Sequence, residues 1–268
     1  MNEKTVTVVY FGEETENRRK QCGLSLIEQL LLSIRSIRQN WSKSVDIHVY
    51  HFWPLSSATQ LELTLLGATI YASTNLIESQ FPLSNKILIG NLYNGNKDIL
   101  FLDCDTVVHY PVEIATSFEM MVAYDVIKNV DKKDYIEIAR CILVELPKID
   151  IYESPAFEYY YYDNIKQFPV FNSGVFFLSK RLQQLFYNEY KKIFFSLYKN
   201  FKNHAWNFYI EQISFCMTII KLKIKYSLFP KGFNFICTPR ADFLKNWDKQ
   251  TVVIEHYAGN NGSPFSFE

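Results

Sequence analysis

The 268-residue chain has no excess of either charge, because Lys and Arg number 28 and Asp and Glu also number 28. Dedicated nucleic-acid binders usually carry a basic face, so this balance argues against that class of function. The five cysteines, at positions 22, 104, 141, 216 and 237, include no C-x-x-C pair. We therefore expect neither a zinc site nor a disulfide framework, but reduced thiols in a cytoplasmic protein.

Long apolar runs are also lacking. Glu3 and Lys4 stand ahead of a short predicted strand, and no sustained apolar segment typical of a secretory signal peptide follows them. No uncharged apolar run is long enough to span a bilayer. Hydrophobic residues nevertheless make up 48 % of the chain, enough for a sizeable core in one large α/β domain.

Short apolar stretches alternate with helical patterns in the first part of the chain, which is typical of βαβ units and a mostly parallel sheet. Strands are predicted over 5–11, 45–52, 68–72 and 98–103, and helices over 22–40, 54–66 and 82–93. Beyond residue 105 we predict strands over 120–124 and 170–179, helices over 133–143, 181–201 and 207–222, and short strands near Ile224 and Val252.

Asp103 and Asp105 directly follow the apolar run Ile99–Leu102, which is typical of a fully buried strand. Two carboxylates this close repel each other, and desolvation strengthens the repulsion. A divalent cation such as Mn²⁺ or Mg²⁺ would remove the conflict and could hold the phosphates of a substrate. Ligands of open α/β sheets bind at this carboxyl end of the strands. The alternative is a solvated turn, in which Asp105 supports the turn backbone.

Four segments resemble, in the same order, the signatures of GT-A glycosyltransferases of family 8, the group of glycogenin and the lipopolysaccharide galactosyltransferases. Residues 99–108 resemble the family's Asp-x-Asp segment, and residues 171–177 its Phe-Asn-Ser/Ala-Gly strand. Glu211 and Gln212 stand where the family usually has Asp-Gln, and residues 254–259 resemble its late His-x-x-Gly. Lys86 also matches a lysine of the family, so the resemblance covers nearly the whole chain.

The resemblance implies a single GT-A, Rossmann-like α/β domain over 1–268. Its mostly parallel sheet would have flanking helices, a donor and metal half over about 1–125, and an acceptor side with added helices and loops over about 126–268. The implied activity is metal-dependent transfer of a hexose-type sugar from a nucleotide-sugar, a UDP-sugar above all, with retention of anomeric configuration. The acceptor would be a glycan, a lipid-linked molecule or a protein, and no nucleic acid is expected as a partner.

The resemblance also assigns roles to single residues. Asp103, Asp105 and His256 would hold the metal, for which an imidazole beside carboxylates favours Mn²⁺ over Mg²⁺. Residues acting at the sugar would be Asn172, Glu211 and Gln212. Residues binding the donor would be Tyr10, Lys86, Asp103, Ser173, Gly174 and Gly259, and Gly262 could add a backbone contact to the phosphates.

Each of these positions also has a purely structural interpretation. His256 could be an ordinary histidine after an edge strand, Lys86 part of a solvated helix face, and Tyr10 a core residue. The Asn172–Gly174 segment could be a structural bulge in a strand, since Gly within a strand marks either a bulge or a close approach. Glu211 could simply favour a helix start.

Three departures from the family pattern keep other functions open. Gly262 stands where the family has a diphosphate-binding lysine, Pro169 replaces a residue that is acidic in some relatives, and Glu255 precedes His256 where an apolar residue is typical. The missing lysine keeps open one alternative, a catalytically weak nucleotide-sugar or metal-binding module on the same scaffold. Pro169 argues against glycogenin-like chemistry and self-glucosylation. A nucleotidyltransferase is less favoured, because the segment Gly12–Glu16 is acidic instead of basic and rich in glycine.

Two aromatic segments bear on the acceptor and on location. Tyr159–Tyr162 is predicted to lie in a loop on the acceptor side, either stacking on sugar rings or partly buried. The helix over 180–202 mixes lysines with phenylalanines. It could lie on the inner face of an anionic membrane, or it could pack on the core with a solvated basic face.

Overall fold

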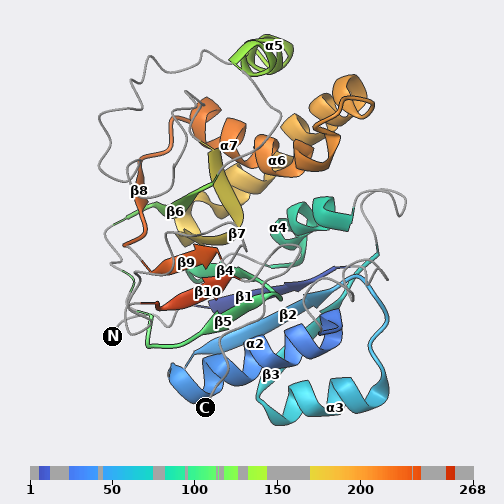
Figure 1. Ribbon diagram of the computed structural model, residues 1–268, viewed down its shortest axis with the longest axis vertical. Coiled ribbons are helices and arrows are strands. Elements are labelled where there is room, and N and C mark those ends of the chain that lie inside the picture. The colour runs from blue at the N-terminus through green and yellow to red at the C-terminus, as the bar shows by residue number, and fades with distance from the viewer. Residues whose placement is uncertain are drawn as a thin grey trace.

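A seven-stranded sheet with the order β3-β2-β1-β4-β7-β6-β8 forms the centre of the computed structural model (Figure 1). The structure describes residues 6–12, 24–41, 45–74, 82–93, 96–112, 114, 118–125, 132–143, 170–230, 232–236 and 252–256. The strands of this sheet are β1 (Val6–Phe11), β2 (Asp46–His51), β3 (Ala68–Ala72), β4 (Ile99–Asp103), β6 (Met120–Asp125), β7 (Val170–Leu178) and β8 (Tyr226–Leu228).

Most neighbours in this sheet are parallel. β1 pairs in parallel with β2 and β4, β2 with β3, and β6 with β8, whereas β7 runs antiparallel to both β4 and β6. This arrangement confirms the prediction of a mixed α/β fold with a mostly parallel central sheet.

A second, three-stranded sheet contains β5 (Thr106–Val108), β10 (Ile254–His256) and β9 (Phe233–Ile236), in the order β5-β10-β9. β5 begins three residues after β4 ends, and β10 pairs antiparallel to it with His256 opposite Thr106. The sequence predicts neither β5 nor β9, because segments of three and four residues are too short for a periodic pattern.

Helices cover both faces of the central sheet (Figure 1). On one face lie α2 (Leu26–Asn40) and α3 (Ser57–Leu65), and Leu30 and Ile34 of α2 pack on Val9, Val49 and Leu102. The other face carries η1 (Pro82–Leu88), α4 (Ile89–Leu92), α6 (Lys180–Phe201), η4 (Asn207–Tyr209) and α7 (Ile210–Lys221), while α5 (Lys132–Cys141) packs on α6. The two apolar layers isolate the strands from water, which leaves the strand ends as the places where polar groups can gather.

The structure changes the predicted elements at several points. The helix predicted over 82–93 is mainly the 3₁₀ helix η1, followed by the single turn α4, and a 3₁₀ turn, η4, likewise opens the helix predicted over 207–222. The strands predicted near Ile224 and Val252 begin two residues later. β7 is continuous, but Val122 pairs with Phe176 and Tyr124 with Phe171, so residues 172–175 form the expected bulge opposite a single residue of β6.

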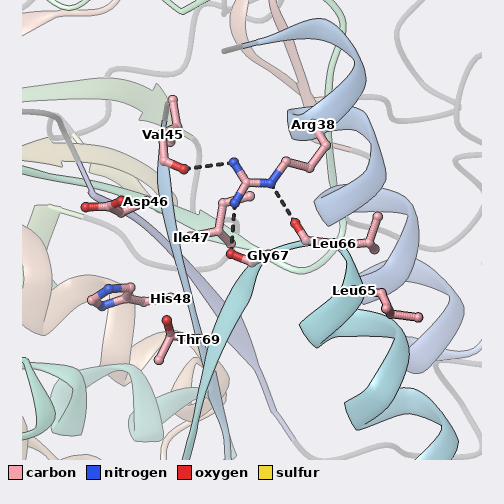
Figure 2. A pocket seen from close by; sticks show the side chains of 9 residues that line it. All are labelled: Arg38, Val45, Asp46, Ile47, His48, Leu65, Leu66, Gly67 and Thr69. Atoms are coloured by element: carbon pink, nitrogen blue, oxygen red, sulfur yellow. Dashed lines mark hydrogen bonds between the residues drawn. The ribbon is translucent and has the colours of Figure 1, made fainter. Parts of the chain in front are cut away.

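A cavity of about 530 Å³ lies at the amino ends of β2 and β3 (Figure 2). Its main polar feature, the Arg38 guanidinium, already donates to the carbonyl oxygens of Val45, Leu66 and Gly67 at 2.7–2.9 Å. Arg38 therefore ties α2 to the start of β2 and to the turn between α3 and β3. The cavity lies at the strand ends opposite to Asp103, so it does not belong to the predicted donor site.

No helix among the described residues is both long and apolar enough to cross a membrane. In α6, Phe186, Phe194 and Phe201 are buried in the core, while Phe195 is 41 % exposed. Most of the aromatic content of this helix therefore serves core packing, and its contact with a membrane surface stays a prediction of the sequence.

Candidate metal and donor site

Two carboxylates and an imidazole meet at the carboxyl end of β4. Asp103 is the last residue of β4, and Asp105 lies in the turn that leads to β5. The hydroxyl of Thr106 closes this turn by donating to the Asp103 carbonyl oxygen at 2.8 Å. Because His256 pairs with Thr106 in the second sheet, β10 brings its imidazole next to Asp105 across more than 150 residues of sequence.

The ligand atoms of Asp103, Asp105 and His256 all lie within 4.8 Å of one another. Asp105 Oδ1 and His256 Nε2 are 3.3 Å apart. The exposed fractions of the three residues are 8 %, 5 % and 2 %. This burial argues against a solvated turn at Asp105, and His256 lies on the central strand of its sheet instead of after an edge strand.

The residues around the triad fit a divalent cation. Asp103 Oδ1 is buried and has no hydrogen-bond partner among the described residues, which leaves one carboxylate oxygen for a metal. The backbone at Gly174 passes so close that a Cβ atom there would lie 2.5 Å from His256 Cε1 and 2.6 Å from Asp103 Oδ2. Carboxylate oxygens with one imidazole nitrogen form a donor set that suits Mn²⁺.

Lys86 of η1 neutralises part of the negative charge of this site. Its Nζ donates to Asp103 Oδ2 at 2.7 Å and to Ser173 Oγ at 3.5 Å. Burial lowers the pKa of Lys86, but the carboxylates of Asp103 and Glu211 outweigh it, so the pKa lies above its usual value. Lys86 is therefore a buried cation that holds Asp103 in place, and the interpretation as a solvated helix face is wrong.

Burial also lowers the pKa of His256, and again the neighbouring carboxylates prevail. The charges of Asp105 and Asp103 raise the pKa of the imidazole above its ordinary value. This electrostatic environment attracts positive charge to the triad, whether a proton or a metal ion carries it.

Among the comparisons with known proteins, only solved structures match this chain, and they bear on its fold. No protein-family model and no curated protein matches the chain. Galactosyltransferase LgtC, solved with donor and acceptor sugar analogs, is 12 % identical; the match covers 95 % of this chain and 87 % of LgtC, with a TM-score of 0.55. The apo form of glycosyltransferase GlyE from Streptococcus pneumoniae TIGR4 is 14 % identical, covering 99 % of this chain and 57 % of GlyE, with a TM-score of 0.57.

Mouse xyloside xylosyltransferase 1 is 13 % identical over 98 % of this chain and 100 % of that protein, with a TM-score of 0.55. This chain has the GT-A glycosyltransferase fold. The resemblance to family 8 read from the sequence is thereby confirmed at the level of the fold.

Three of the predicted donor and sugar residues, Asn172, Ser173 and Glu211, lie close to Lys86 or the triad. Asn172 and Ser173 are buried in the bulge of β7, where Asn172 Oδ1 accepts a hydrogen bond from the Gly174 N–H at 2.8 Å. Glu211 and Gln212 open α7, as predicted. Glu211 is buried and accepts a hydrogen bond from Ser173 Oγ at 3.0 Å, which places it one side chain away from Lys86.

Tyr10 lies beside the triad on β1, in register with Asp103. Its ring is buried, with Lys86 Nζ 5.7 Å from the ring centroid and the Phe52 ring at 5.7 Å. This packing favours the core interpretation and also fixes one wall of the site next to Lys86. Gly259, Gly262 and Tyr159–Tyr162 lie outside the described residues.

Tyr190 of α6 is a polar residue at this site that the sequence analysis did not identify. Its hydroxyl contacts Glu211 Oε1 and lies 3.3 Å from the Glu211 carbonyl oxygen. In the sequence Tyr190 is one of several aromatic residues on the apolar face of an amphipathic helix, and that pattern predicts only core packing.

Proposed function

We propose that this chain is a metal-dependent glycosyltransferase that moves a hexose-type sugar from a nucleotide-sugar, with a UDP-sugar as the preferred donor. The observation that carries the proposal is the buried triad of Asp103, Asp105 and His256 at the carboxyl end of β4 in a GT-A fold. LgtC, which shares the fold, is a galactosyltransferase solved with donor and acceptor sugar analogs, which supports the choice of substrate class.

Asp103, Asp105 and His256 would hold Mn²⁺ or Mg²⁺. When bound, the cation supplies Lewis-acid stabilisation for the negative charge that develops on the diphosphate as the glycosidic bond breaks. Lys86 keeps Asp103 oriented, since its Nζ occupies Oδ2 while Oδ1 stays without a protein partner among the described residues. The three proposed ligands are at most 8 % exposed, and low exposure to water strengthens each electrostatic interaction among them.

Asn172 and Gln212 are the residues we assign to the transferred sugar. Both stand on regular elements, Asn172 in the bulge of β7 and Gln212 in the first turn of α7. One solved form of LgtC is an active-site mutant in which glutamine is replaced by glutamate, which supports a role for an amide in this kind of site. The proposed reaction keeps the anomeric configuration, in keeping with the resemblance to family 8.

One experiment distinguishes an active glycosyltransferase from the alternative, a catalytically weak binding module. Hydrolysis and transfer of UDP- and GDP-sugars would be measured with Mn²⁺, with a chelator, and for Asp105→Asn. We expect Mn²⁺-dependent turnover of a UDP-sugar that falls by at least about 100-fold in the variant, because removing a ligand leaves the diphosphate charge uncompensated. Asp46→Asn, at the opposite end of the strands, is the matched control and should keep full turnover.

Two results would contradict the proposal in different ways. Full turnover in the chelator would remove the metal from the mechanism. Calorimetric binding of UDP with Mn²⁺, without turnover of any donor, would identify the chain as a binding module.

A further inference from the structure

A chain of hydrogen bonds runs from helix α6 to the triad through buried side chains. Tyr190 donates to Glu211 Oε1, Ser173 donates to Glu211 Oε2 at 3.0 Å, and Lys86 lies 3.5 Å from Ser173 and 2.7 Å from Asp103. These side chains come from α6, α7, β7, η1 and β4. Neighbouring polar groups in such a chain depend on one another for their orientation.

Glu211 is the member whose position needs support. The residue is only 2 % exposed, so its carboxylate depends on protein donors instead of bulk water, and the same burial raises its pKa. Both of its oxygens accept hydrogen bonds from protein hydroxyls, one from Tyr190 and the other from Ser173. Loss of either donor would leave a buried acceptor without a partner, which is unfavourable unless the side chain rotates.

A rotated Glu211 has one obvious new partner. The Lys86 ammonium is already bound to Ser173, the residue that donates to Glu211, and the charge of Glu211 acts on Lys86. If Glu211 drew Lys86 toward itself, Asp103 would lose the contact that orients its carboxylate for a metal.

We propose that Tyr190 is a positioning residue of the donor site: its hydroxyl fixes Glu211 so that Lys86 stays on Asp103. The inference rests on the proposed function, since Asp103 matters only if the triad serves a reaction. It makes the interior face of α6 part of the active-site frame, although Tyr190 itself is only 1 % exposed and is too deeply buried to reach a substrate.

The neighbouring residue Tyr187 provides a matched control. It lies three positions earlier on the same helix and is 4 % exposed, and its hydroxyl has no hydrogen-bond partner among the described residues. Tyr187→Phe and Tyr190→Phe therefore remove the same atom from similar surroundings, and only the second breaks the chain to the triad.

Steady-state kinetics with the UDP-sugar that the donor screen finds to be turned over test the inference. We expect Tyr190→Phe to lower kcat on the order of tenfold while KM for the donor stays within about twofold, because alignment is lost and no donor contact is removed. Tyr187→Phe should leave both constants unchanged. Equal kcat values for the two variants, whatever their stabilities, would overturn the inference.

A double-mutant cycle in the free energy of unfolding tests the contact without any activity measurement. Tyr190→Phe should destabilise the wild type clearly more than a Glu211→Met background, where the carboxylate acceptor is gone and only the main-chain carbonyl oxygen of residue 211, 3.3 Å from the hydroxyl, remains. If the wild type turns over no donor, the proposed function fails, but the cycle still shows whether Tyr190 positions Glu211. Additive changes in the free energy of unfolding would show that Tyr190 does not position Glu211. A clear coupling energy between the two substitutions would support that role.

Discussion

At Gly174 the structure leaves no room for a side chain, because two of the proposed metal ligands, Asp103 and His256, lie directly over the backbone. A Cβ atom would approach His256 Cε1 and Asp103 Oδ2 to 2.5 and 2.6 Å. Gly174→Ala should therefore displace the ligands and weaken Mn²⁺ binding by about 10- to 100-fold, as changes next to metal ligands typically do. Calorimetry with Mn²⁺ and UDP measures this loss.

Val175→Ala is the control for disturbing β7 in general. The Val175 side chain packs in the apolar layer below the sheet, away from the triad, so this variant should lose stability and keep its Mn²⁺ affinity. Unchanged Mn²⁺ affinity in Gly174→Ala would mean that the triad does not bind the metal in the described geometry.

The residues of the candidate site differ in how well their roles could be predicted from the sequence. Asp103, Asp105 and His256 stand in recognisable motifs, and the structure brings them together as predicted. Lys86 matched a family lysine, but its burial and its bond to Asp103 depend on how η1 packs against β4. Tyr190 carries no motif, because the partner that gives its hydroxyl a role is 21 residues away on another helix.

At the scale of elements, the contact between α6 and α7 contains a charge pair that should make stability depend on pH. Glu189 Oε1 accepts from Lys221 Nζ at 2.8 Å, and Oε2 lies 3.4 Å from Lys192 Nζ. The hydrogen bond from Lys221 lowers the pKa of Glu189, against a smaller opposing effect of burial. A depressed folded-state pKa contributes stability above the unfolded pKa, which is lost as pH falls through the folded value.

Glu189→Gln should therefore lower the free energy of unfolding by roughly 1 kcal/mol at pH 7, and by progressively less as the pH is lowered to about 3, because the pair is lost as the pH falls through the depressed folded-state pKa of Glu189. Urea unfolding at both pH values checks this expectation. Lys221→Met should remove the same pH-dependent difference. A constant gap between wild type and Glu189→Gln across this range would contradict the assigned role of the pair.

Elements with a clear local pattern of apolar residues were predictable, and those fixed by packing were not. The strand over 68–72 and the helix over 181–201 agree with β3 and α6 within one residue. The segment over 82–93 is mostly 3₁₀, and Gly90 lets α4 approach α6 until a Cβ would lie 2.2 Å from Tyr187 Cβ. Such a contact between distant segments has no signal in local sequence.

For the whole molecule, the sequence predicted one α/β domain and a mostly parallel sheet, but not the second sheet. Pairing of residues 106–108 with 254–256 is non-local, and each strand has only three residues. The motif placed His256 beside the two aspartates without explaining how the chain returns there. The structure supplies that explanation, since β10 lies between β5 and β9.

This arrangement makes the triad a link between the two sheets, because Asp103 ends a strand of the large sheet and His256 ends the central strand of the small one. Bound metal should therefore stabilise both sheets together. With Mn²⁺ and UDP at about 100 times their dissociation constants, openings that release the metal should become about 100-fold rarer. Amide hydrogen exchange should then slow in β5 and β10 as well as in β4.

His256→Ala tests whether this histidine carries the stabilising effect of the metal from the large sheet to the small one. Mn²⁺ and UDP at the same multiple of their own dissociation constants should still slow exchange in β4, where Asp103 remains, but should protect residues 254–256 far less. His109→Gln is the matched control, because His109 bonds to Glu255 on the same sheet at 2.9 Å and is not one of the proposed ligands. Equal protection of β10 in wild type and His256→Ala would show that the metal does not connect the sheets through this histidine.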